Sequence, residues 1–153
     1  MTRTSTRRKP GPTRAAIDTG ALLALANPRD QYHSQAASIA HRFVESGGRW
    51  IGSVLVLAEL HGHLLRWRGP AVAREVVAAV RRDPAYDWRA VDADLLDTAM
   101  EEWLARFADQ RLSLTNAVTF ALMRQEKLAT AFAFDQGFRT AGFTLLAADP
   151  STP

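Results

Sequence analysis

Two aspartates follow short apolar runs that have the composition of buried strands. Asp18 comes directly after the run at 15–17, and Asp135 ends the run at 130–134. In open sheets of parallel strands, ligands bind outside the carboxyl ends of the strands, so both carboxylates are candidates for one site. Each also has a structural alternative, because Asp18 could cap the following helix and Asp135 could form a turn before Gly137.

A third carboxylate, Glu59, lies inside the run VLVLAEL at 54–60. This run is apolar on nearly all sides, which predicts a buried helix. An unpaired buried carboxylate is costly, so such groups are paired or bound to metal. No Lys or Arg stands three or four residues from Glu59, and His63, one turn later, is the pairing alternative. We favour the metal-site interpretation.

The absence of cysteine restricts the metal chemistry. Disulfides and thiolate-zinc sites are excluded, so a metal would need carboxylates, carbonyls, water or histidine, a donor set that favours Mg²⁺ or Mn²⁺. His61 and His63 are two residues apart and diverge on a helix, so they do not predict a zinc pair. There is no glycine-rich phosphate loop of the Walker or Rossmann kind, which argues against an ATPase or a dehydrogenase.

Strand-like runs alternate with helical patterns along the chain. The runs lie at 14–18, 49–53, 86–91, 130–134 and 143–146. Apolar residues have helical spacing after His33 and again before Asp83, and they step by four from Val91 to Phe107, which predicts one long helix there. This alternation predicts an α/β fold, a parallel sheet of about five strands with helices on both faces. We expect a single domain at 14–150.

Basic residues are concentrated at the N-terminus. Residues 1–14 carry five basic side chains and no acid, whereas the rest of the chain has 14 basic and 16 acidic residues. We expect residues 1–13 to be a disordered, solvated tail, although its charge could contact RNA phosphates. No apolar run approaches the roughly 20 residues needed to cross a bilayer. No signal-peptide core follows the basic residues, so we expect a cytoplasmic location without membrane partners.

Large apolar residues on the predicted helices exceed what a domain of this size easily buries, which favours a homodimer. They are Leu64, Leu65, Trp67, Trp103 and Phe107. Arginine outnumbers lysine seventeen to two, and Arg111 is among the arginines that could border a groove and bind phosphate, although most should be solvated surface. Trp67 is the candidate for stacking on a base.

Four segments occur in a characteristic order: IDTGALLAL at 17–25, VLVLAEL at 54–60, DQRLSLTNAVTFALM at 109–123 and AFAFDQGF at 131–138. Together they resemble a VapC-type PIN-domain ribonuclease over about residues 14–147. The resemblance implies a PIN-like sheet flanked by helices and an endoribonuclease dependent on Mg²⁺ or Mn²⁺. It also implies a toxin with a small cognate antitoxin as partner, an RNA substrate and a homodimer.

The resemblance assigns the first, second and last family acids to Asp18, Glu59 and Asp135, which would be metal ligands and catalytic residues. Asn116 stands where the family has aspartate. Asparagine keeps an oxygen but carries no charge, so the cluster would have three negative charges in place of four. A natural and an engineered origin of Asn116 both fit the sequence. The alternative is therefore a weakened or inactive PIN domain that binds RNA or an antitoxin without efficient cleavage. A DNA-directed nuclease is a third hypothesis, because the same cluster can hydrolyse either polymer.

Overall fold

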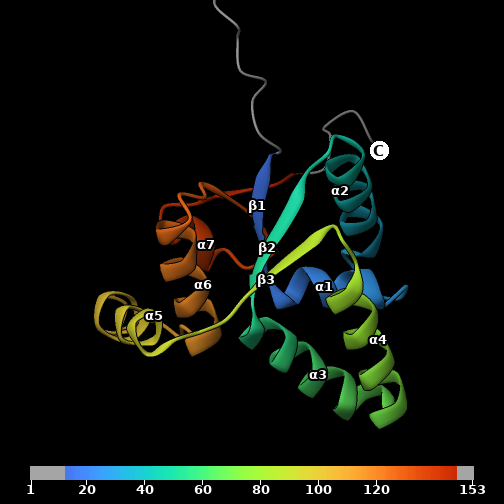
Figure 1. Cartoon of the computed structure of the whole chain (residues 1–153), viewed down its shortest axis with the longest axis horizontal. Helices are drawn as coiled ribbons and strands as arrows, with labels where there is room; N and C mark the ends of the chain where they lie inside the picture. Colours follow the sequence, from blue (N-terminus) through green and yellow to red (C-terminus); the bar gives the residue numbers. More distant parts are fainter. Residues whose placement is uncertain (1–12, 148–153) are drawn as a thin grey trace, which may run out of the picture.

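The computed structural model describes residues 13–147. It contains a five-stranded parallel sheet in the order β3-β2-β1-β4-β5 (Figure 1). The strands are β1 (Arg14–Ile17), β2 (Arg49–Ser53), β3 (Tyr86–Arg89), β4 (Thr130–Phe132) and β5 (Thr144–Leu145). All five predicted strands are confirmed, and four of them are one or two residues shorter at one or both ends. The predicted tail falls almost entirely outside the described residues, as do residues 148–150.

The central strand β1 is buried on both faces, because its residues Ala15, Ala16 and Ile17 are all nearly inaccessible. Ala16 pairs with Ile51 of β2 on one side and with Ala131 of β4 on the other. Continuous apolar strands of this kind are typical of parallel sheets that helices cover on both sides.

Helices cover both faces of the sheet, as predicted (Figure 1). On one face lie α1 (Thr19–Ala26), α2 (His33–Glu45), α3 (Val54–Arg68) and α4 (Pro70–Arg82), which share a core with Ile17, Trp50 and Phe132. On the other lie α5 (Ala93–Thr98), the π-helical turn η1 (Ala99–Leu104), α6 (Leu114–Gln125) and α7 (Gly137–Thr140), which share a core with Ala16, Ile51 and Ala131. Among these described helices, none is long and apolar enough to cross a membrane.

The prediction of one long helix from Val91 to Phe107 is wrong. The α-helix α5 has six residues, the wider η1 follows it, and Phe107 lies in the turn beyond. Apolar residues that step strictly by four drift around an α-helix of about 3.6 residues per turn. A wider π turn compensates for the drift, and it keeps Ala99 and Trp103 buried on the same core as Leu95.

The large apolar residues on the helices are less exposed than the homodimer argument assumed. Leu64 and Trp103 are buried inside the domain, and Phe107 packs partly against the core. Leu65 and Trp67 of α3 are exposed, at 42% and 47% of their surface.

Candidate active site

All four predicted site residues line one cleft of about 330 Å³ at the carboxyl edge of the sheet. Asp18 directly follows β1, Glu59 comes from the middle of α3, Asn116 from the first turn of α6, and Asp135 from the loop after β4. The structure thus brings together residues from four segments that are far apart in the sequence. Their catalytic roles remain predictions.

Asp18 is the most strongly desolvated of these groups, with 6% of its surface exposed. Its backbone N–H donates to the carbonyl of Phe132 in β4, which fixes the end of β1 beside the neighbouring strand. Burial raises the pKa of Asp18 to about 7; the backbone N–H groups of Thr19 and Gly20 oppose the rise, and the negative charges of Glu59 and Asp135 add to it. The carboxyl group is therefore held where its ionised form is unfavourable without a cation.

The capping alternative for Asp18 is supported only in part. Asp18 occupies the N-cap position of α1, and the backbone N–H groups of Thr19 and Gly20 stabilise its carboxylate, but its side chain makes no capping hydrogen bond further into the helix. The neighbouring hydroxyl of Thr19 is buried in the wall of the same cleft, and its Oγ1 has no hydrogen-bond partner among the described residues. A buried polar atom without a partner is unusual in native proteins, and a water or an ion in the cleft would satisfy it.

Asp135 combines the turn role and the cleft role that its sequence position left open. Its Oδ1 accepts a hydrogen bond of 2.7 Å from the backbone N–H of Gly137, which closes the turn into α7. Its Oδ2 accepts a hydrogen bond of 3.1 Å from Nδ2 of Asn116. A Cβ on Gly137 would lie 3.0 Å from Asp135 Oδ1, so the absence of a side chain there lets the carboxylate keep this orientation.

Asn116 is placed by the start of α6. Ser113 caps this helix, because its Oγ accepts a hydrogen bond of 3.1 Å from the backbone N–H of Asn116. The amide of Asn116 then reaches Asp135 across the cleft. An aspartate in this place would set two carboxylates against each other in the metal-free protein, so asparagine replaces a repulsion with a hydrogen bond.

Glu59 is only half-buried, so the prediction of a fully buried glutamate is wrong. The helix α3 buries Val56, Leu57, Leu60 and Leu64 along one side, whereas Val54 and Ala58 are exposed. The pairing alternative is not seen either: His63 lines the same cleft but makes no ion pair or hydrogen bond with Glu59. On sequence alone, the free-energy cost of a buried, unpaired carboxylate is attributed to Glu59. In the structure, Asp18 is the carboxylate that bears this cost.

Arg111 contributes a positive charge to the wall of the acidic cleft. It is exposed and forms no ion pair with any residue in the part of the chain that the structure describes. A free guanidinium beside carboxylates is suited to bind a phosphate that approaches them. On sequence alone, Arg111 is only one of several arginines that could border a groove. Nothing in the local sequence around Arg111 indicates on which face of the protein it lies.

The oxygen atoms of the cleft are the type that Mg²⁺ and Mn²⁺ prefer. Within residues 13–147, however, no three His, Asp or Glu side chains are close enough together to hold a metal ion by themselves. Asp18, Glu59 and Asp135 therefore share the cleft without forming a closed ligand set. The residues fit an ion held by one or two carboxylates and by water, which is how Mg²⁺ is usually bound. The unpartnered Thr19 hydroxyl and the desolvated Asp18 carboxyl are both groups that a hydrated cation would satisfy.

The chain has clear relatives among known proteins. The family model of the PIN domain matches residues 15–144. The 23S rRNA-specific endonuclease VapC20 of Mycobacterium tuberculosis is 33% identical over 127 residues, which cover 83% of this chain and 93% of the relative.

Solved structures agree with this relationship. The crystal structure of Mycobacterium tuberculosis VapC20, described as a Sarcin-Ricin loop cleaving toxin, superimposes with a TM-score of 0.76 at 32% identity, covering 87% of this chain and 98% of that one. VapBC2 from Rickettsia felis, solved bound to a DNA fragment from its promoter, gives a TM-score of 0.65 at 11% identity and covers 90% of this chain and all of that one. FitAcB from Neisseria gonorrhoeae gives 0.63 at 13% identity and covers 88% of this chain and 97% of that one; these last two likenesses concern the fold alone. The chain therefore belongs to the PIN-domain family and is a homologue of the VapC toxins.

Proposed function

We propose that this protein is an endoribonuclease that needs Mg²⁺ or Mn²⁺ and acts as the toxin of a toxin–antitoxin pair. The observation that carries the proposal is the desolvated carboxyl of Asp18, which shares one cleft with Glu59 and Asp135. Such a group stabilises a bound cation and is costly without one. The relationship to VapC20, a 23S rRNA-specific endonuclease, supports RNA as the substrate class.

In this mechanism Asp18 and Asp135 would hold the cation, and Glu59 would orient the attacking water and accept its proton. A bound divalent ion would lower the pKa of water and offset the charge that develops on the phosphate. Arg111 binds a non-bridging phosphate oxygen from the opposite wall. Asn116 acts through Asp135, because its amide fixes the Oδ2 atom of that carboxylate. The water oxygen bonds to phosphorus, one P–O bond to ribose breaks, and the released oxygen takes up a proton.

One observation favours a second candidate function. The Asn116 amide donates a hydrogen bond to one carboxylate oxygen of Asp135, and asparagine carries one negative charge fewer than the aspartate of the family pattern. A PIN domain with this change would bind a cation more weakly and cut slowly, while it still bound RNA or an antitoxin. The rate of RNA cleavage distinguishes an active endoribonuclease from a weakened PIN domain. A DNA substrate tests the hypothesis of a DNA-directed nuclease.

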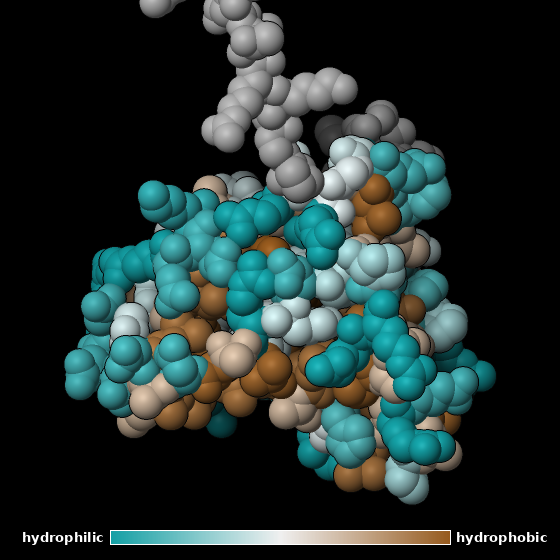
Figure 2. Space-filling view, in the orientation of Figure 1, coloured by the Kyte–Doolittle hydropathy of each residue, from teal (hydrophilic) through white to brown (hydrophobic). Residues whose placement is uncertain are grey.

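Partners follow from the same proposal. Several large apolar side chains are exposed within the described residues, among them Val54, Leu65, Trp67, Met100 and Leu114. Apolar surface forms a band across one face, from the side of α5 and α6 towards α3 and α4 (Figure 2). We propose that a second copy of the chain and the small antitoxin cover surfaces of this kind.

The first prediction is that the purified protein cleaves RNA with multiple turnovers when Mg²⁺ or Mn²⁺ is present and not in EDTA. Asp18→Asn should lower kcat at least ~100-fold, because loss of even an indirect partner of a metal ligand typically costs ~10–100-fold. Asp109→Asn, which changes an exposed aspartate outside the cleft, is the matched control and should leave the rate unchanged. Equal rates for the Asp18 variant and the control would contradict the assignment of Asp18, and faster cleavage of DNA than of RNA would contradict the substrate class.

Asn116→Asp is expected to tighten Mn²⁺ binding at least about tenfold and to raise the cleavage rate. Two unit charges ~4 Å apart interact by about 4 kcal/mol at an effective dielectric of ~20, and a divalent ion doubles this before desolvation is deducted. Part of that energy is enough, since ~1.4 kcal/mol corresponds to one factor of ten. The variant also loses the hydrogen bond to Asp135, so its melting temperature in EDTA should fall. Calorimetric titration of both proteins with Mn²⁺ measures the affinity, and identical affinities would show that Asn116 lies outside the field of the ion.

The stability of the metal-free protein should depend on pH through Asp18. Its pKa rises from an ordinary value of 3.8 to about 7 in the fold, so the folded state favours the protonated carboxyl. This contribution to stability is complete below about pH 4 and disappears as the pH rises through about 7, with a slope of at most ~1.4 kcal/mol per pH unit. In EDTA, Asp18→Asn should flatten the dependence and melt at a higher temperature than the wild type at pH 8. Thermal melts from pH 4 to pH 8, repeated with excess Mg²⁺, measure this; parallel curves for the two proteins would mean that Asp18 titrates normally.

The protein should be a dimer at tens of micromolar by light scattering, and addition of its cognate antitoxin should suppress RNA cleavage. Leu65→Lys and Trp67→Lys place charges on the exposed side of α3 and should weaken the dimer. Ala79→Lys on α4 adds the same single positive charge at an exposed position and is the control. A monomer in the wild type would refute the homodimer, and full activity in a tight antitoxin complex would refute inhibition by the antitoxin.

A further inference from the structure

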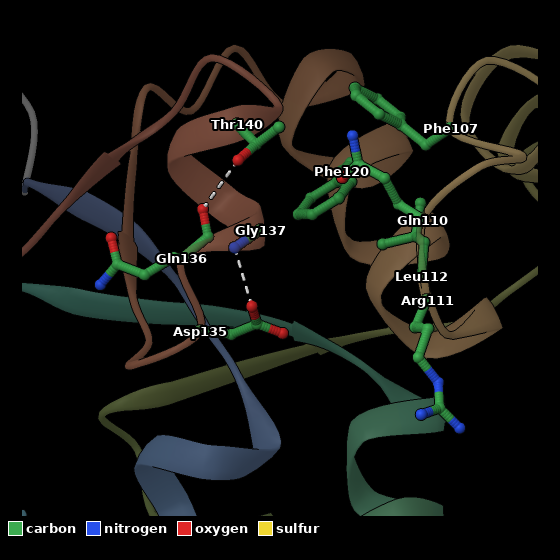
Figure 3. Close-up of a pocket in the computed structure, with 9 residues that line it drawn as sticks. All are labelled: Phe107, Gln110, Arg111, Leu112, Phe120, Asp135, Gln136, Gly137 and Thr140. Carbon is green, nitrogen blue, oxygen red and sulfur yellow. Dashed lines mark hydrogen bonds between the residues drawn. The ribbon is translucent and has the colours of Figure 1, made fainter.

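A second cavity, of about 210 Å³, adjoins the acidic cleft (Figure 3). Asp135 and Arg111 line both hollows, so the two are neighbours across these residues. One wall comes from the start of α7, with Gly137 and Thr140, and the other from the loop between η1 and α6, with Gln110 and Leu112. Neither the proposed chemistry nor the capping of α6 uses this cavity.

Its apolar surfaces are rigid. The Phe120 ring is 1% exposed and is held by an edge-to-face contact with Phe138 at 4.9 Å and by Trp103 at 5.2 Å between ring centroids. The Phe107 ring stacks almost parallel on Trp103, with 6.0 Å between centroids and 8° between planes. The cavity is therefore bordered by aromatic rings that pack against other rings of the core.

The side-chain amide of Gln110 is placed to form hydrogen bonds with a ligand in the cavity. The Gln110 side chain is directed across the cavity towards the Phe120 ring (Figure 3), and it makes no hydrogen bond with any described residue. Its backbone is fixed, because the Gln110 N–H donates to the carbonyl of Phe107 and its carbonyl accepts from Leu112. A glutamine amide offers both a donor and an acceptor, which match the paired groups on the edge of a base. The Thr140 hydroxyl, by contrast, donates to the Gln136 carbonyl at 3.3 Å.

The lining selects a neutral, flat group. Apart from the shared Asp135 and Arg111, every residue around the cavity is uncharged. The volume lies below the roughly 300–1,000 Å³ of pockets that hold whole drug-sized ligands. Gly137 has no side chain and takes up little of the space in the cavity. Aromatic surface and a hydrogen-bonding amide are features by which proteins hold a base that has left its stack.

We infer that this cavity binds one nucleobase of the RNA substrate, next to the phosphate that is cut, and that Gln110 reads the edge of that base. The inference rests on the proposed function and adds to it a determinant of sequence preference. Arg111 lies between the two hollows and would bind the phosphate that joins the base in the cavity to the acidic cleft. The substrate would then enter with one base unstacked, as in a loop or a single strand.

Binding without cleavage tests the cavity separately from the chemistry. Fluorescein-labelled hexanucleotides of uridine, cytidine, adenosine and inosine are titrated in EDTA and followed by fluorescence anisotropy. The wild type should prefer one hexamer by at least about tenfold, as expected for a paired contact to a base edge. Gln110→Leu, which keeps the size of the side chain and removes the amide, should reduce the preference to less than ~3-fold.

Gln136→Leu is the matched control, because Gln136 also borders the cavity but its side chain is directed away from Gln110 and Phe120 (Figure 3). This variant should keep the wild-type preference. Thr140→Tyr, which fills the cavity from α7, should remove the preference in the same way as Gln110→Leu. Gln110 and Thr140 are both exposed, so far-ultraviolet circular dichroism should show an intact fold in each variant.

Cleavage of a random RNA pool with Mg²⁺, read by sequencing the new ends, completes the test. The same base should be enriched beside the cut in the wild type and in Gln136→Leu, but not in Gln110→Leu. Cleavage without base preference in the wild type, or an unchanged preference in Gln110→Leu, would overturn the inference while the nuclease function stands. A binding preference that Gln110→Leu abolishes, in a protein that cuts nothing with Mg²⁺, would support the cavity and refute the nuclease function.

Discussion

The burial of one carboxyl group constrains the whole site. Asp18 follows the central strand of a parallel sheet, so the strands on either side and the helices on both faces shield it from water. The bond between the Asp18 N–H and the Phe132 carbonyl holds the backbone of this residue at the end of β1. Parallel strands end at the same edge, and the segment after β4 therefore brings Asp135 to the same cleft. The sheet that stabilises the protein is thus what holds negative charges together, and a cation is the partner that offsets this cost.

Asn116 shifts the balance between stability and affinity for a cation. Its amide donates to Asp135, and so the metal-free cleft contains a hydrogen bond where a fourth acid would add repulsion. The same bond competes with any ion for the Asp135 Oδ2 atom. The free energy of cation binding is the difference between the metal-bound and the metal-free cleft. A metal-free cleft with less repulsion between carboxylates therefore binds a cation less tightly. The residue that departs from the family pattern therefore stabilises the metal-free form at the expense of the loaded one.

The sequence predicted what depends on local pattern and on the geometry of parallel sheets. The five strands and the two covered faces followed from short apolar runs that alternate with helical spacing, and Asp18 and Asp135 were found because each follows such a run. Glu59 was identified by its motif, but its burial was overestimated, since an apolar composition does not reveal that α3 leaves Val54 and Ala58 in solvent. The π turn η1 was missed because a step of four is compatible with an α-helix over a few residues. The cavity proposed to bind a base is lined by Phe107 and Gln110 on one side and by Gly137 and Thr140 on the other. The two pairs are about thirty residues apart in the sequence and share no motif. Only tertiary packing brings them together.

Asp135 and Arg111 separate the two hollows, and this arrangement divides chemistry from recognition. The acidic cleft depends on the ends of β1 and β4, on α3 and on the first turn of α6, which supply its acidic and amide side chains. The cavity depends on the loop between η1 and α6, whose side chains Gln110 and Leu112 contribute nothing to the acidic cluster. Substitutions in that loop can change which base fits without moving Asp135, because the Gly137 N–H fixes Asp135 Oδ1 from the opposite wall. If the proposed roles hold, the scaffold keeps one hydrolytic centre while the loop beside it adapts to different RNA targets.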